Sequence, residues 1–234
     1  MAAVLKRELG SYFRSPIGYT IIAIFYFFAN IFFNMYCLSY NSGNMSSVFQ
    51  NTFLIVLFII PIITMKTFSE DKKLGTDKLL LTSPVSTGRI VFGKYLSAMI
   101  IYVICLLIFV VHGLIIEYFS TAQWSVILCT VLGLALMGSA IISIGLFISS
   151  LTESQVIACV GTLGVGFFLY IMDVLANLAN NAIVSYVVGV FTFIQRFSNF
   201  TLGIFNPADV LYFLSVTCLF LWFTMKSFGK NSRS

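Results

Sequence analysis

The chain alternates between long runs of apolar residues and short segments that hold nearly all of its charges. Six of these runs are long enough to cross a bilayer, because about 20 apolar residues in a helix span the hydrocarbon core. The predicted spans are residues 17–38, 48–65, 95–116, 125–150, 156–172 and 207–225. Since an even number of spans returns the chain to its starting side, both termini are expected on one side. The pattern therefore predicts an all-α integral membrane protein with a single domain over residues 1–234.

The last span has a clear start signal. Asn206 is a typical N-cap residue, Pro207 suits the first helical position, and Asp209 places a negative charge in the first turn. We therefore expect the sixth helix to begin at Pro207.

Composition supports a membrane protein. Hydrophobic residues make up 59% of the chain and charged residues only 9%, and the mean hydropathy is +1.02. A soluble domain carries about 25% charged residues. The net charge of +5 does not indicate nucleic-acid binding, because the basic residues flank the apolar runs as topology signals do.

The distribution of basic residues predicts the orientation. Of the 13 Lys and Arg residues, all but Arg196 fall before the first span, between spans two and three, or after span six. Basic residues are enriched on the cytoplasmic side of membrane proteins. We therefore predict cytoplasmic termini and a location in the plasma (inner) membrane.

A short amphipathic helix is predicted before the first span, over residues 1–16. Leu5, Leu9, Tyr12 and Phe13 recur at helical spacing, and basic or polar residues occupy the other faces. Such a helix lies at the inner membrane surface. The alternative is a basic flank that only fixes the topology.

The loop between spans two and three contains a second polar helix, predicted from about Ser69 to Thr82. Ser69 can cap it, Glu70 and Asp71 suit its first turn, and Pro84 limits its end. Held between two spans, this helix can dock on a cytosolic partner and transmit motion. The alternative is a solvated connector.

The outer segment between spans five and six includes an apolar stretch at residues 183–194. This stretch is too short to span the bilayer and too apolar for a solvated loop. A re-entrant or outer-leaflet helix fits it better.

Three segments resemble the permeases of type 2 ABC exporters, especially the branch typified by gliding-motility permeases. They are Lys6–Tyr19, Phe68–Tyr95 and Asp209–Leu214. The resemblance covers essentially the whole chain. It implies a membrane subunit that pairs with a cytosolic ABC ATPase and with a second permease subunit, identical or similar. An auxiliary outer protein and membrane lipid are further expected partners, whereas nucleic acid is not.

The resemblance also implies which residues contact the ATPase. They lie in the N-terminal helix, in the segment between spans two and three, and in the short turn at residues 151–155. The matching positions are Lys6, Arg7, Glu8, Arg14, Pro16, Glu70, Asp71, Lys72, Lys73, Gly75, Thr76, Asp77 and Glu153. The chain departs from the family at Asp77, where Glu is more common. The outer segment at residues 185–205 matches more loosely and is the candidate location of substrate preference.

Catalysis within this chain is not expected. Residues 88–94 match the start of a phosphate-binding P-loop, but Tyr95 replaces the Ser or Thr that would hold magnesium. The single histidine, His112, excludes a multi-histidine metal site, and Glu117 lies about 140° away on an ideal helix. We therefore expect no catalytic residue, metal or cofactor, with ATP hydrolysis in a separate subunit.

The main alternative is an ion-coupled carrier or a channel that works alone, and a membrane-embedded enzyme is the third. Carriers usually need an ionisable residue near the midplane, and the predicted spans have charged residues only at or beyond their ends. Asn30 and Asn34 share one face of the first span. They either line a path or bond to a neighbouring helix.

Overall fold

The computed structural model describes residues 2–39, 45–76, 86–119, 121–178 and 192–230, and every regular element in these ranges is helical. The elements are α1 (Ala2–Arg14), α2 (Pro16–Phe33), the π-helix η1 (Asn34–Leu38), α3 (Ser46–Thr64), α4 (Ser69–Lys73), α6 (Thr87–Phe119), α7 (Trp124–Leu151), α8 (Gln155–Leu178), α10 (Phe193–Thr201) and α11 (Pro207–Lys230).

Within these ranges six helical segments are long and apolar enough to cross a membrane, which agrees with the six predicted spans. They are Pro16–Leu38, Ser46–Lys73, Thr87–Phe119, Trp124–Leu151, Gln155–Leu175 and Pro207–Gly229. The third helix begins at Thr87 rather than near residue 95. Arg89 and Lys94, which the sequence analysis counted as loop charges, therefore belong to its first turns.

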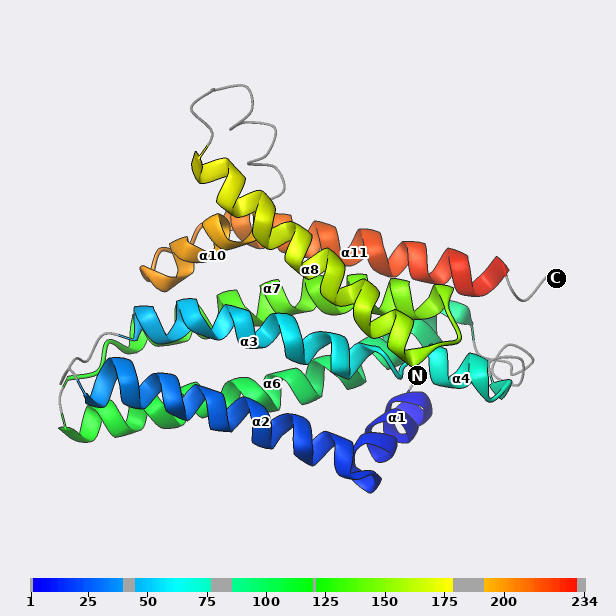
Figure 1. The fold of residues 1–234 in the computed structure, drawn as a ribbon, viewed down its shortest axis with the longest axis horizontal. Helices are drawn as coiled ribbons and strands as arrows, with labels where there is room; N and C mark the ends of the chain where they lie inside the picture. The colour runs from blue at the N-terminus through cyan, green and yellow to red at the C-terminus, as the bar shows by residue number, and fades with distance from the viewer. Residues whose placement is uncertain (1, 40–44, 77–85, 120, 179–191, 231–234) are drawn as a thin grey trace.

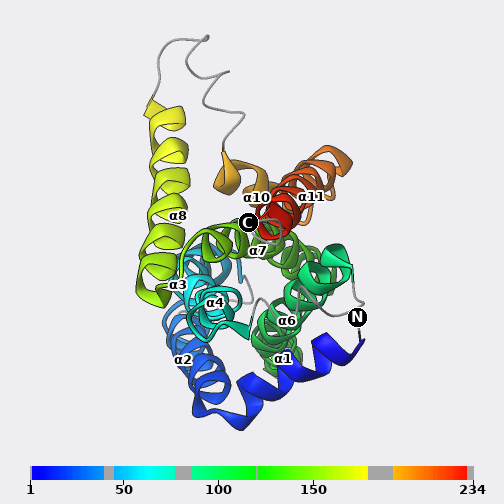
Figure 2. The same cartoon turned by 90° about the vertical axis from the view of Figure 1, so that its right-hand side faces the viewer.

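The helices form an elongated bundle (Figure 1). The start of α1, the helix α4 and the end of α11 lie at one end of the long axis, and α10 lies at the other. Figure 2 views the bundle from the first of these ends and shows α1 lying across it, from α2 toward α6. We call this the α4 end, and the opposite one the α10 end.

The helix α7 forms the centre of the bundle, and glycines let its neighbours approach closely. A Cβ atom at Gly138 would overlap the ring of Tyr102 on α6, and one at Gly145 would overlap the side chain of Thr64 on α3. The hydroxyl of Tyr102 donates to the carbonyl oxygen of Leu134, at 2.9 Å. These contacts join α3, α6 and α7 into a tightly packed core.

The helices α2, α8 and α11 lie on the outside of this core. Only 22% of the most apolar stretch of α8 is buried, against 67% for α7. Large side chains such as Phe168 and Trp222 are more than half exposed. In a bilayer, such apolar faces contact lipid or another subunit.

The predicted start of the sixth span and the predicted N-terminal helix are both observed. The backbone N–H of Ala208 donates to Asn206 Oδ1 at 3.1 Å, which confirms Asn206 as the N-cap of α11. A helix is also present before the first span, and only Ser15 separates α1 from α2. Its position at a membrane surface stays a prediction.

The two other predicted segments are described in part. Between spans two and three the structure places the short helix α4, whereas residues 77–85, including Asp77, lie outside the described residues. Between spans five and six, most of the stretch at residues 183–194 also lies outside them. The re-entrant path therefore stays a prediction, and the described part of this segment is α10.

Candidate functional site

A buried lysine lies at the centre of the α4 end. Lys94, on the second turn of α6, has a side chain that is only 1% exposed. Its Nζ atom lies 2.6 Å from Asp71 Oδ2 and 3.1 Å from Glu8 Oε1. It also donates to the carbonyl oxygen of Thr67. A buried charge is strongly unfavourable unless it is paired and hydrogen-bonded, and these three acceptors satisfy Lys94.

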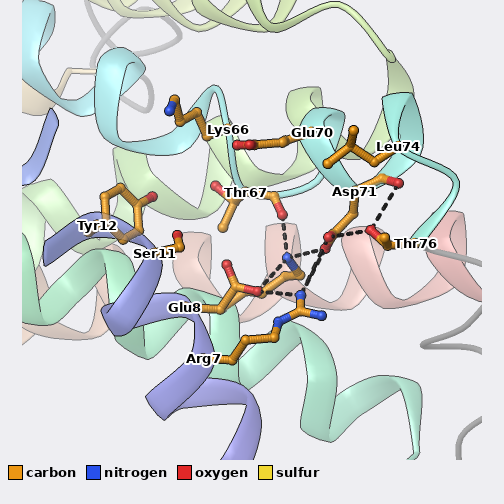
Figure 3. A pocket seen from close by; sticks show the side chains of 11 residues that line it. Arg7, Glu8, Ser11, Tyr12, Lys66, Thr67, Glu70, Asp71, Leu74 and Thr76 are labelled. Carbon is orange, nitrogen blue, oxygen red and sulfur yellow. Dashed lines mark hydrogen bonds and ion pairs between the residues drawn. The ribbon is translucent and has the colours of Figure 1, made fainter. Parts of the chain in front are cut away.

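Arg7 and Thr76 complete the arrangement (Figure 3). One guanidinium nitrogen of Arg7 lies 2.7 Å from Glu8 Oε1 and 3.3 Å from Asp71 Oδ2. The hydroxyl of Thr76 donates to Asp71 Oδ1 at 2.7 Å. We call Arg7, Glu8, Asp71 and Lys94 the charge cluster. Its two cations and two anions balance, and they join α1, α4 and α6.

A tyrosine fixes α1 to the end of α3. The Tyr12 hydroxyl donates to the carbonyl oxygen of Ile63 at 2.5 Å. Burial, and to a smaller extent the charge of Glu8, raises the pKa of Tyr12. The hydroxyl therefore stays protonated and remains a donor.

The N-terminus of α4 is capped by a side chain from another span. The hydroxyl of Ser149, on α7, accepts the backbone N–H groups of Phe68 and Ser69, each at 3.2 Å. Ser69 was predicted to cap this helix, and that prediction is wrong. Ser69 is the first residue of α4 rather than the residue before it, and its own hydroxyl donates to the carbonyl oxygen of Met65.

A cavity of about 240 Å³ opens beside the charge cluster. Helix α1, the segment after α3 and the start of α6 all contribute to it. The lining residues are Arg7, Glu8, Ser11, Tyr12, Lys66, Thr67, Glu70, Asp71, Leu74, Thr76 and Lys94.

A second set of polar contacts holds α10 at the opposite end. The carboxylate of Asp173, on α8, accepts the backbone N–H groups of Phe193, Ile194 and Gln195 at 3.0 to 3.3 Å. Because the first N–H groups of a helix have no partner within it, the Asp173 carboxylate caps the N-terminus of α10 from the neighbouring helix α8. This contact ties α8 to α10.

Asp209 ties α10 to α11 in a similar way. Its carboxylate lies 3.1 Å from Arg196 Nη1 and 2.7 Å from Asn199 Nδ2. The guanidinium carbon of Arg196 lies 4.2 Å from the ring centre of Tyr212. Asp209 was predicted only as a first-turn charge of α11, so its contacts with α10 are an addition from the structure.

Among known families, the model of the ABC-2 family transporter proteins matches residues 38–232. This chain belongs to that family. The match includes α3 to α11 and leaves out α1 and α2. The family consists of transmembrane permease components of ABC transporters, which are not themselves catalytic and which in general work with an ABC ATPase. A comparison with curated proteins found no match.

In this ABC-2 permease, five of the residues assigned to ATPase contact line the cavity. They are Arg7, Glu8, Glu70, Asp71 and Thr76. Glu8 and Asp71 are largely buried there in ion pairs within the chain.

The remaining assigned residues lie elsewhere. Lys6 and Arg14 are on α1 but do not line this cavity, and Pro16 begins α2. Lys72, Lys73 and Gly75 are on or just after α4, with Gly75 at a φ of +68°, and Glu153 is exposed in the turn between α7 and α8. Asp77 is outside the described residues.

Asn30 bonds to a neighbouring helix, which is the second of the two roles predicted for it. Its Oδ1 atom lies 2.9 Å from His112 Nε2, so it bonds α2 to α6. The ring of His112 stacks on that of Phe33 at 4.2 Å. Glu117 instead accepts the backbone N–H of Ala122, so it is not paired with His112. Asn34 is exposed on η1, and its place on a path stays a prediction.

Sequence reasoning missed Lys94, which was treated as a loop charge and as part of a false P-loop. The signal was present, because Ile90, Val91 and Phe92 extend the helical apolar pattern back beyond Tyr95. An ionisable residue inside such a run needs a partner. No group of three or more His, Cys, Asp or Glu side chains in the described part of the permease could hold a metal ion.

Proposed function

We propose that this permease is the membrane subunit of an ATP-driven exporter, driven by a separate cytosolic ATPase that docks at the α4 end. The observation that carries the proposal is the charge cluster. It joins the two segments, α1 and α4, that the sequence resemblance assigns to the ATPase. A partner that moves α4 would therefore move α1 and α6 with it, and through Ser149 it would also act on α7.

The orientation follows from the charges. Among the described residues, the Lys and Arg residues other than Arg196 belong to α1, the segment 66–73, the start of α6 and the end of α11, which lie at the α4 end, whereas Arg196 is on α10. The positive-inside rule therefore supports a cytoplasmic α4 end and cytoplasmic termini. A cytosolic ATPase has access to this end only. The plasma membrane is the proposed location.

The docking surface has suitable chemistry. Leu74, just after α4, is 67% exposed although it is a large apolar residue. Basic Lys72 and Lys73 precede it, and acidic Glu153 is exposed at the same end of the bundle. Protein interfaces commonly combine an apolar centre with a polar rim, and Leu74 with its charged neighbours is compatible with that arrangement. We assign these residues, with Glu70 and Gly75, to the ATPase contact.

The substrate path is proposed to form between two permease subunits. The outer helices α2, α8 and α11 present apolar side chains that the bundle does not cover. A second copy, or a similar chain, can pack against part of this surface and enclose a path that opens when the ATPases close. The resemblance to the gliding-motility branch supports export as the direction.

The test is affinity purification of the tagged chain from its native membrane in mild detergent. Mass spectrometry of the companions is combined with an assay of vanadate-sensitive ATP hydrolysis. We expect an ABC ATPase in stoichiometric amount. Absence of an ATPase, under conditions that preserve a known ABC complex, would point instead to a carrier or channel that works alone.

A matched pair of variants locates the contact. Leu74→Glu at the α4 end is expected to lose the ATPase while the chain keeps its thermal stability. Tyr118→Glu changes a side chain that is 84% exposed near the α10 end. This variant is expected to retain the ATPase. Loss of the ATPase from both variants, or from neither, would contradict docking at α4.

A further inference from the structure

The helix α1 presents different chemistry on each side. Val4, Glu8 and Tyr12, spaced four apart, are buried against the bundle. With 100° between successive helical residues, the stripe of Lys6, Gly10 and Arg14 lies about 200° away, on the opposite side. This outer side takes no part in the charge cluster.

A groove of about 390 Å³ runs along the outer side of α1. Its lining combines an apolar stripe with a basic one and includes no acidic residue. The lining residues are Leu5, Lys6, Leu9, Gly10, Phe13 and Arg14.

Gly10 gives the groove its depth. A Cβ atom built there would have no neighbouring atom within 4 Å, so the space above Gly10 is open. Lys6 and Arg14 are exposed on either side of it. Eight residues of helix separate them by about 12 Å along the axis. One anionic group can therefore sit over Gly10 with a cation approaching from each side.

The groove lies next to the membrane boundary. Only Ser15 separates Arg14 from Pro16, where the first span begins. Helix α1 crosses the end of the bundle instead of continuing the direction of α2 (Figure 2). Arg14 is therefore held near the level of the lipid headgroups, and the neighbouring apolar stripe can face acyl chains.

We propose that this groove binds an anionic phospholipid. Its phosphate lies over Gly10 between Lys6 and Arg14, and an acyl chain follows Leu5, Leu9 and Phe13. Among the described residues the groove is lined by two cations and no acidic residue, which favours negative charge, and the apolar stripe next to the first span favours a lipid over a soluble anion. This proposal rests on the membrane location of the chain and does not require the proposed ATPase.

The proposal divides α1 between two partners. The resemblance assigned Lys6 and Arg14 to ATPase contact together with Arg7 and Glu8. The structure places these pairs in different surroundings, because Arg7 and Glu8 belong to the charge cluster and line the cavity beside it, whereas Lys6 and Arg14 line the groove. Lipid binding by Lys6 and Arg14 anchors the outer side of α1 while its inner side stays free to follow α4.

The experiment measures lipid retained by the purified full chain without an ATPase. The chain is exchanged into nanodiscs of phosphatidylcholine with a small fraction of phosphatidylglycerol, released into detergent and weighed by native mass spectrometry. We expect phosphatidylglycerol to be retained in preference to phosphatidylcholine. Each basic residue near an anionic membrane surface contributes about five-fold in affinity, so Lys6→Gln with Arg14→Gln should weaken retention by about 25-fold.

Two further variants separate a groove from general charge attraction. Gly10→Leu keeps both cations and fills the open space, so it should also lose the retained lipid. Lys72→Gln with Lys73→Gln removes the same charge from α4, outside the groove, and should keep it. Both Gly10→Leu and the control pair should preserve the thermal stability of the chain.

Three outcomes would overturn the proposal. The first is equal retention of the two lipids by the unaltered chain. The second is normal phosphatidylglycerol retention in Gly10→Leu, which would reduce the effect to net charge. The third is unchanged retention in the Lys6 and Arg14 double variant. If the same variant also lost the ATPase in a separate affinity purification from its native membrane, the groove would be a protein-docking surface.

Discussion

Lys94 Nζ lies 2.6 Å from Asp71 Oδ2, although the two residues belong to different helices of the bundle. The contact is almost completely shielded from solvent, since the Lys94 side chain is 1% exposed. An exposed ion pair contributes little to stability, but loss of one partner from a buried pair leaves a charge that neither water nor protein compensates. The pair therefore makes the position of α4 depend on that of α6.

Lys94→Met should strongly destabilise the permease, because it removes the buried cation between Glu8 and Asp71 and leaves one positive charge, on the partly exposed Arg7, against two carboxylates. Breaking a buried ion pair costs about 3 to 5 kcal/mol. Thermal unfolding in detergent measures the effect, with Lys73→Met as a control for an exposed lysine. Addition of Glu8→Gln and Asp71→Asn should recover part of the loss. An unfolding temperature equal to that of the control would show that the charge cluster does not hold the helices together.

Ser149→Ala should loosen α4 without unfolding the bundle, because it removes the acceptor for the N–H groups of Phe68 and Ser69. Loss of a cap costs about 0.5 to 2 kcal/mol. Amide hydrogen exchange at residues 68–76 should become faster. The control is Ser150→Ala, since the Ser150 hydroxyl donates to the carbonyl oxygen of Phe147 within its own helix. Equal exchange in the two variants would argue against capping across helices.

Asp173→Ala should free the start of α10 from α8. Hydrogen exchange at residues 193–195 should rise, because the three N–H groups lose their acceptor, while exchange in α4 should stay unchanged. Asp173→Asn keeps an oxygen acceptor and should show a smaller effect. Glu117→Gln, on an exposed carboxylate at the same end, serves as the control. If exchange at α10 is the same in Asp173→Ala as in that control, the carboxylate does not act as its cap.

Gly138→Ala should destabilise the bundle, because the added methyl group meets the ring of Tyr102 and forces α6 and α7 apart. Overpacking of a core costs about 1 to 3 kcal/mol. Gly164→Ala is the opposite case, since nothing lies within 4 Å of its Cβ position on α8. Ala exceeds Gly in helix propensity by about 1 kcal/mol, so this variant should unfold at the same or a higher temperature. Similar unfolding temperatures for the two variants would contradict the close approach of α6 and α7.

The fold was largely predictable because it follows from the apolar composition and length of the membrane-spanning segments. Apolar runs of about 20 residues define the spans regardless of how they pack, and Asn206 and Pro207 define the start of α11 through local chemistry. The charge cluster was not predictable in this way. Its members come from three separate segments, and the sequence does not show which charged residues of different segments will form ion pairs.

The error at Ser69 has the same cause. Ser, Thr, Asp and Asn cap helices in local motifs, so the sequence suggests the nearest such residue. The hydroxyl that caps α4 comes from Ser149, far along the chain, and only tertiary packing brings it there. Lys94 could have been found by extending the third span to Thr87, but its partners could not.

The order of the charge-cluster residues along the chain determines when the cluster can form during biosynthesis. Glu8 and Asp71 precede Lys94 in the chain, so both carboxylates emerge from the ribosome before the Lys94 ammonium group. Until the third span has emerged, Arg7 is the only basic member of the cluster available to them. The α4 end can therefore reach its buried arrangement only after that span is inserted, because the single positive charge of Arg7 does not balance the two carboxylates.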